Sequence, residues 1–113
     1  MLFRSQKKHS AHVLTGDLTL ADLIAGHEFM GADAAIVTGN HTGQAVSVHD
    51  LAVARQAGSM PIVVGSGASP ESLPELLEHA TAVIVGSALK KDGFWANPVD
   101  PDRAAAFVAA RGR

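Results

Sequence analysis

Apolar residues along the chain gather in three short runs, separated by longer stretches in which apolar positions recur with a helical spacing. The runs cover residues 34–38, 62–64 and 82–85, are made of Ala, Val and Ile with one Thr, and do not alternate with polar residues. An unbroken apolar run of this length is typical of a strand covered on both faces. The pattern therefore predicts three buried strands of a parallel sheet.

The stretches between these runs predict helices, because their apolar residues lie three and four positions apart. Each stretch begins at a residue suited to cap a helix N-terminus, namely Thr19, Ser47, Ser69 or Asp100. The first two caps have an Asp three residues later, which resembles a capping box. The last two are followed directly by proline, which is favoured at the first helical position. Four helices are therefore expected.

The alternation of helix and strand predicts βα units on a parallel sheet. Gly31 and Gly58 stand where the first two helices should stop. A fourth strand ahead of the first helix is needed to complete four units, and only residues 2–9 can supply it, although this stretch is polar. No linker divides the chain, so residues 1–113 are expected to form one α/β domain.

Composition excludes several classes of function. The chain is 47% hydrophobic and has a formal net charge of -2, with no basic stripe that would favour nucleic acid or an anionic membrane surface. Cysteine is absent, which excludes disulfides and Cys-ligated zinc, and the six His residues show no metal-ligand spacing. No apolar run reaches the roughly 20 residues of a membrane helix. The polar N-terminal stretch does not resemble a signal peptide. We expect a cytoplasmic protein without metal or cofactor.

Glycine and serine follow two successive predicted strands directly, as Gly65-Ser66-Gly67 and as Gly86-Ser87. The carboxyl ends of parallel strands share one edge of the sheet, where ligands bind in such folds. Glycine allows the backbone to approach a ligand, and a helix starting at Ser69-Pro70 would direct its positive end toward an anion. Each loop alone is as well explained by a tight turn. Their repetition favours a site for a small anionic or phosphorylated molecule.

Other polar residues are expected at the same edge. Thr38 and Asn40 follow the run at 34–38 and offer a hydroxyl and an amide to a ligand, although this stretch is also rich in turn formers. Lys90 follows Ser87 closely enough to neutralise a bound phosphate, although charged loops are usually solvated. These residues complete the predicted ligand-binding set.

Lys8 and His9 would stand at the end of the first strand and are the candidate catalytic residues. A lysine can bind an anion or form an imine, and a histidine can act as general acid or base near neutral pH. The alternative is a solvated terminus that carries charged residues.

Several longer segments share a more specific pattern. They are Lys8-His9-Ser10, residues 32–39, Thr42-Gly43, residues 61–67, residues 83–93, and residues 97–101 with Arg103 and Phe107. Together they resemble the BtpA family over nearly the whole chain. The resemblance implies a (β/α)8 TIM-type barrel of about twice this length, of which this chain would be the C-terminal half with four parallel βα units. The first strand is more polar than the family pattern.

The resemblance leaves the function open between three alternatives. The family implies an enzyme of sugar or nucleotide-like metabolism, or a non-catalytic assembly protein with a role in photosystem I biogenesis. A truncated, inactive remnant is the third. Four strands cannot close a barrel, so the sheet would leave apolar side chains and two strand edges exposed. We therefore expect a homodimer, or a complex with a separate N-terminal half-barrel.

Overall fold

A computed structural model describes residues 3–6, 19–38 and 46–112 of the chain. Its strands form one parallel sheet whose order follows the chain: β1 (Phe3–Gln6), β2 (Ala34–Val37), β3 (Ile62–Val64) and β4 (Ala82–Val83). The helices alternate with these strands: α1 (Leu20–Phe29), α2 (Val48–Ala57), α3 (Leu73–His79) and α4 (Pro101–Arg111). Two short 3-10 helices, η1 (Ser87–Leu89) and η2 (Lys91–Gly93), lie between β4 and α4. The predicted α/β alternation is confirmed.

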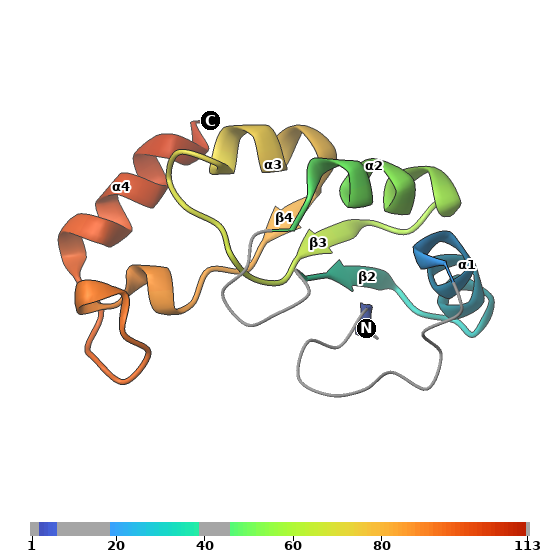
Figure 1. Ribbon diagram of the computed structural model, residues 1–113, viewed down its shortest axis with the longest axis horizontal. Helices are drawn as coiled ribbons and strands as arrows, with labels where there is room; N and C mark the ends of the chain where they lie inside the picture. Colours follow the sequence, from blue (N-terminus) through green and yellow to red (C-terminus); the bar gives the residue numbers. More distant parts are fainter. Residues whose placement is uncertain (1–2, 7–18, 39–45, 113) are drawn as a thin grey trace.

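The helices pack on one face of the sheet, along its upper side in Figure 1. The strand register places Ala35 beside Ile62 and Val37 beside Val64 on that face. These four residues join one buried cluster with side chains from every helix, which are Leu20, Ile24, Leu51, Ala54, Leu73, Leu76 and Phe107. The strands follow one another in chain order, and the helices lie on one face. This arrangement results when every βα connection has the same handedness.

The opposite face of the sheet carries the residues that alternate with Ala35, Val37, Ile62 and Val64 along the strands. These residues are not part of the buried cluster that contacts the helices. Ala34 and Val63 on this face are buried, Ile36 is half-buried, and Ala82 is exposed. Ile84, which continues the line of Ala82, is 48% exposed. Exposure of this apolar face is thus concentrated at β4, the last strand of the sheet.

Three predicted helix starts, at Thr19, Ser47 and Asp100, are confirmed by their caps. The Thr19 hydroxyl accepts from the Asp22 amide at 3.1 Å, and the Thr19 amide donates to the Asp22 carboxylate at 3.3 Å. The Ser47 hydroxyl accepts from the Asp50 amide at 3.0 Å. α1 stops two residues before Gly31, whose φ of 88° is favourable only for glycine.

The regular part of the third helix begins later than predicted, at Leu73, and Ser72 before it makes no side-chain cap bond. The predicted cap bonds are made by Ser69, whose hydroxyl accepts from the Ser72 amide at 3.2 Å and whose carbonyl accepts from the Leu73 amide at 3.0 Å. The reason for the later start is Pro74. A helix starting at Pro70 would place Pro74 in its interior, where proline lacks the amide hydrogen and collides with the preceding turn. The chain instead forms a turn over residues 70–72, in which the hydroxyl and amide groups of Ser69 and Ser72 bond to one another.

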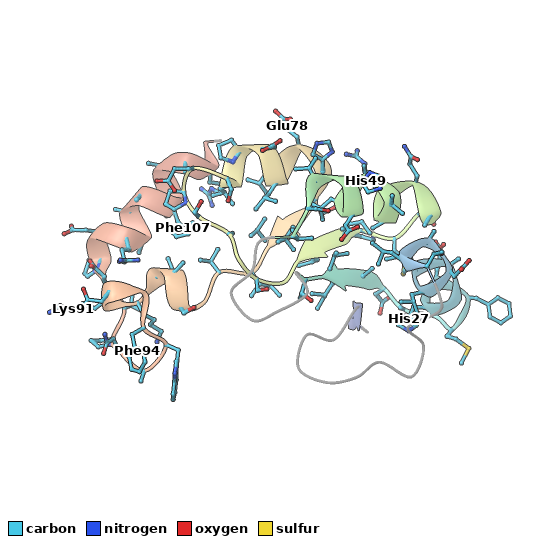
Figure 2. The ribbon with its side chains drawn as sticks, viewed as in Figure 1. His27, His49, Glu78, Lys91, Phe94 and Phe107 are labelled. Atoms are coloured by element: carbon cyan, nitrogen blue, oxygen red, sulfur yellow. The ribbon has the colours of Figure 1, made fainter. Side chains whose placement is uncertain are left out.

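The last strand is shorter than predicted: it covers Ala82–Val83 and does not extend to residue 85. β3 ends at Val64, whose carbonyl accepts from the Ile84 amide at 2.8 Å, so no residue of β3 remains opposite Val85. The chain then turns into η1. α4 is attached by a single buried side chain, Phe107, which joins the core between α4 and the sheet (Figure 2).

A polar contact joins α1 to the turn before β3. The Glu28 carboxylate accepts hydrogen bonds from the Ser59 hydroxyl and from the Ser59 amide, the latter at 3.0 Å. These two bonds hold the pKa of Glu28 below its ordinary value. The bond from the hydroxyl is the larger cause and the bond from the amide the second. None of the helices in the described part of the chain is long and apolar enough to cross a membrane.

Leu51→Ala should destabilise the fold by about 3 kcal/mol, because Leu51 is fully buried between α2 and the sheet. Phe29→Ala is the control, since Phe29 is 89% exposed and its loss should change stability by less than about 0.5 kcal/mol. Urea unfolding followed by circular dichroism measures both. Equal losses in the two variants would contradict the described core.

Glu28→Gln should destabilise the protein at neutral pH and have a smaller effect in acid. A lowered folded-state pKa gives stability that is present above about 4.3, the ordinary pKa of Glu, and is lost as pH falls through the lowered value. Urea midpoints of the native protein and the variant should therefore converge as pH falls below the ordinary pKa of Glu. A difference in urea midpoint that is independent of pH would mean that the charge of Glu28 does not contribute to the contact with Ser59.

Candidate functional site

The loops predicted to bind a ligand leave the sheet at one edge. Gly65 follows β3 directly, and the chain beyond β4 reaches Gly86 and Ser87 at the start of η1. Because β3 and β4 are neighbouring parallel strands, their carboxyl ends point the same way. Thr38 follows β2 at this edge and is buried. Four of the predicted positions therefore share one end of the sheet, where folds of this class bind ligands.

Gly65 is required by packing. A Cβ at this position would lie 2.5 Å from the Thr38 Cγ2 and 2.9 Å from the Ile36 Cγ2, closer than any side chain could tolerate. The Gly65 amide donates to the Val37 carbonyl at 2.8 Å. This amide is thus used within the sheet and is not free to bind a ligand. Gly65 instead lets Thr38 and the following loop approach one another.

Ser66 carries the unusual feature of the site. Its Oγ is buried and has no hydrogen-bond partner. Among the described residues, no other buried polar side-chain atom lacks a partner. A buried hydroxyl that bonds to nothing costs roughly 1–3 kcal/mol, and such atoms are rare in folded proteins. The next residue, Gly67, has a φ of 78°, so the loop turns at a position that suits glycine. The hydroxyl is therefore held in place while its bonding capacity is unused.

The start of α3 is not part of this loop. α3 begins at Leu73, beyond the turn of residues 70–72, and the hydroxyls of Ser69 and Ser72 bond within that turn. The capped turn that begins at Ser69 therefore lies between Gly67 and the regular helix. Any anion at the loop would be bound by the loop's own groups.

Lys90 lies close to Ser87 along the backbone. Its amide donates to the Ser87 carbonyl at 3.0 Å, and its side chain is half-buried. The residue also pairs with Val99 in an antiparallel bridge that closes the loop between η2 and α4. The described contacts tie Lys90 to the Gly86-Ser87 side of the edge and not to Gly65–Gly67.

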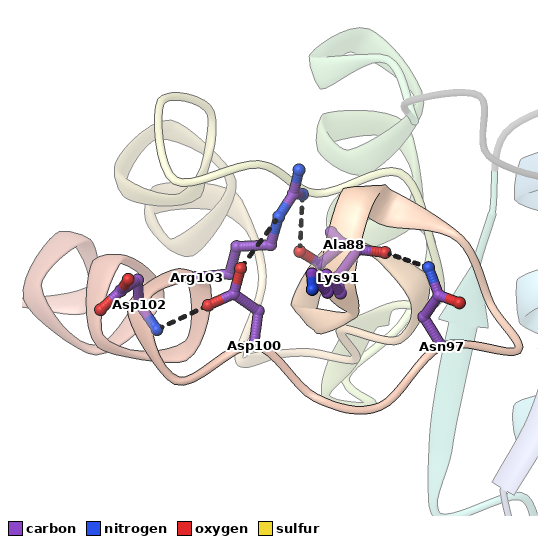
Figure 3. Close-up of polar contacts among 6 residues, drawn as sticks. All are labelled: Ala88, Lys91, Asn97, Asp100, Asp102 and Arg103. Atoms are coloured by element: carbon purple, nitrogen blue, oxygen red, sulfur yellow. Dashed lines mark hydrogen bonds and ion pairs between the residues drawn. The ribbon is translucent and has the colours of Figure 1, made fainter.

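Arg103 and Asp100 fix the segment that follows Ser87. The Arg103 guanidinium donates to the Ala88 carbonyl at 3.2 Å and lies 4.0 Å from the Asp100 carboxylate (Figure 3). The Asp100 carboxylate also caps α4 by accepting from the Asp102 amide at 2.9 Å. Asn97 closes the same loop through a 2.8 Å bond to the Lys91 carbonyl. Arg103 is part of the family pattern, but only the structure reveals this positioning role.

Three predicted site residues, Lys8, His9 and Asn40, lie outside the described residues. Within the described part of the chain, no group of three or more His, Asp or Glu side chains could hold a metal ion. His27 is half-buried on α1, and His49 is exposed on α2 (Figure 2).

A separate hollow of about 410 Å³ lies at the opposite end of the strands. Its polar lining includes Arg55, Ser59, His79 and Thr81, none of which is a predicted site residue. Arg55 donates to the Glu78 carbonyl at 3.0 Å and thereby caps the end of α3. The contact is structural, and the hollow is distinct from the strand-end loops.

Comparisons with known proteins give the chain a family. Residues 1–113 match the model of the BtpA family. An uncharacterised mitochondrial protein of Caenorhabditis elegans is 35% identical over 103 residues, 91% of this chain and 37% of that protein. An uncharacterised protein of Thermococcus kodakarensis is 41% identical over 101 residues, 89% of this chain and 38% of that protein.

A third relative has a descriptive name. The photosystem I biogenesis protein BtpA of Synechocystis is 37% identical over 106 residues, 91% of this chain and 36% of that protein. The chain thus spans little more than a third of the length of the curated relatives that it matches. No solved structure matches it significantly.

Gly65→Ala should destabilise the protein by about 1–3 kcal/mol, because the new methyl group would collide with Thr38 and Ile36. Gly26→Ala in α1 meets nothing within 4 Å and should instead stabilise the protein by up to about 1 kcal/mol. Adding Thr38→Ser to Gly65→Ala removes one of the colliding methyl groups and should recover part of the loss. Thermal unfolding measures all three, and a neutral Gly65→Ala would contradict the described contact.

Proposed function

The chain belongs to the BtpA family, and from this premise we propose that it binds a small anionic, phosphorylated molecule at the carboxyl ends of its strands. The observation that carries the proposal is the buried Ser66 hydroxyl without a partner. A phosphate oxygen bound there would accept its hydrogen bond and remove the cost of leaving it unsatisfied. The loop that holds Ser66 is fixed on one side by the Gly65 contact with Thr38.

Residues after β4 would complete the site. Gly86 and Ser87 begin the second loop at this edge, and Lys90 follows closely, with its backbone amide bonded to the Ser87 carbonyl. A lysine provides a point charge for a phosphate without demanding one geometry. The Arg103 and Asp100 contacts hold the segment in place behind Ser87. Ser66, Ser87 and Lys90 are thus the proposed ligand-binding side chains, and Thr38 and Gly65 position them.

We place the four βα units in the C-terminal half of a (β/α)8 barrel. Two features support this placement. The strands follow one another in chain order, and all helices pack on one face. A doubly wound sheet would instead reverse its strand order and carry helices on both faces. In barrels, neighbouring loops late in the chain often hold a phosphate, which agrees with the proposed site.

We propose ligand binding and do not assign a reaction. Lys8 and His9 stay the hypothetical catalytic pair, as an imine-forming or anion-binding lysine and an acid–base histidine. Enzymes of sugar or nucleotide-like metabolism act on phosphorylated molecules of this kind. The site is therefore suited to such a substrate whether or not the chain by itself is catalytic.

A second function is favoured by the name of one relative, the photosystem I biogenesis protein of Synechocystis. In that alternative the chain is a non-catalytic assembly or interaction protein. Its partner would be a macromolecule, and phosphate compounds would have no effect on its stability. A fold without either activity, as an inactive remnant, would show neither property.

Ser66→Ala separates ligand binding from a structural role. Without ligand the variant should be as stable as the native protein or more stable, because it removes an unsatisfied hydroxyl. Inorganic phosphate and glucose 6-phosphate should raise the melting temperature of the native protein but raise that of the variant much less. Isothermal titration should show affinity at least about tenfold weaker for the variant, the loss expected for a hydrogen bond to a charged group.

Thr81→Ala is the matched control, because exposed Thr81 precedes β4 at the other end of the sheet. It should leave phosphate affinity unchanged. Ser66→Asp should abolish binding, since a carboxylate would repel the anion. Failure of the native protein to bind either phosphate compound, or equal affinity in native protein and Ser66→Ala, would overturn the proposal.

A further inference from the structure

β4 is an open edge of the sheet. One side of the strand pairs with β3, through Val63 with Ala82 and Val64 with Val83. No strand within residues 3–6, 19–38 and 46–112 pairs with its other side. The backbone groups along that side are therefore available to a further strand.

Both faces of this edge are apolar. On the helix side, a pocket of about 370 Å³ lies between β4, α3 and α4, and its lining includes Val83, Val85 and Val108. Val108 is 60% exposed. On the other face Ala82 is exposed and Ile84 is 48% exposed. We call these five residues with the open strand the β4 edge surface.

The β4 edge surface lacks the charged residues and prolines that protect many edge strands. Ala82, Val83, Ile84 and Val85 include no charged residue and no proline. A strand added beside β4 would satisfy the free backbone groups, cover Ile84 and close the pocket beside Val108. The surface is therefore shaped for a parallel strand with its own apolar neighbours.

We propose that the β4 edge surface binds a second copy of this chain, whose β1 pairs in parallel with β4. β1 is the other edge of the sheet, because it pairs only with β2 within the described residues. A two-fold axis parallel to the strands joins β4 of each copy to β1 of the other. Both seams then form together, and neither copy retains an open edge.

Two further observations favour this occupant. The relatives are more than twice as long as the segment that matches this chain, so more βα units than this chain supplies belong to the family architecture. A second copy supplies such units with the same strand direction. The net charge of each copy is only -2, which opposes their association weakly. An antiparallel pairing of β4 with β4 would leave both β1 edges open.

Sedimentation equilibrium of the full chain, from micromolar to millimolar concentration, tests the dimer. We expect a dimer that dissociates on dilution. Ile84→Glu should weaken it by about 100-fold or more, because the seam would bury an unpaired charge. Val99→Glu is the control, since Val99 is 53% exposed but lies on the loop before α4. It should leave dimerisation unchanged.

Cross-linking identifies the seam, because the chain has no cysteine of its own. The variant with both Phe3→Cys and Ala82→Cys should form dimers with a flexible bismaleimide, and the two single variants should not. A folded monomer at every concentration, a dimer indifferent to Ile84→Glu, or cross-linking by Ala82→Cys alone would overturn the proposal. A stable complex with a separately encoded βα polypeptide in place of the dimer would also overturn it. Phosphate titration is not part of this test, so the dimer and the anion site can fail separately.

Discussion

The structure depends on one constraint: each parallel strand receives its helix on the same face of the sheet. Burial of the apolar residues of β2 and β3 against all four helices enforces this arrangement. It has two consequences. The carboxyl ends of the strands meet at one edge, where Thr38 contacts the Gly65 loop. No helix of the described residues covers the other face, and the exposure of this face is greatest at β4.

Both consequences leave groups in the fold whose unsatisfied bonding or exposure lowers its stability. Further contacts to these groups would stabilise the fold. An unsatisfied hydroxyl such as that of Ser66 costs roughly 1–3 kcal/mol, and covering one large apolar side chain such as Ile84 contributes about 1.5 kcal/mol or more. The whole stability of a small domain is about 5–15 kcal/mol. A ligand at Ser66 and a strand beside β4 would therefore each make a substantial difference.

Local signals predicted most of the fold. The strands at residues 34–37 and 62–64 and the caps at Thr19 and Ser47 follow from apolar runs and from short side-chain contacts, which one sequence reveals. Ser69 caps a turn as predicted, but the regular helix begins only at Leu73 because of Pro74, five residues after Ser69. The length of β4 depended on where its neighbour β3 ends, which is a tertiary property.

The site was less accessible to prediction than the fold. Its position at the strand ends follows from the topology, but the roles of its residues follow from contacts between distant segments. The methyl groups that require Gly65 come from β2 and its end, and the carbonyl that holds Arg103 belongs to η1. Nothing in the sequence distinguishes the Ser66 hydroxyl, which lacks a partner, from that of Ser69, which has one. Lys8, His9 and Asn40 lie outside the described residues, so their roles stay predictions.

The most direct test of the account is a map of amide chemical shifts during titration with inorganic phosphate. A phosphate site at the strand ends should give saturable shifts at Ser66, Gly67 and Ser87, and none at Ser59 or Thr81 at the opposite end of the sheet. Shifts that centre on Ser59 and Thr81, or that are spread evenly over the surface, would contradict it.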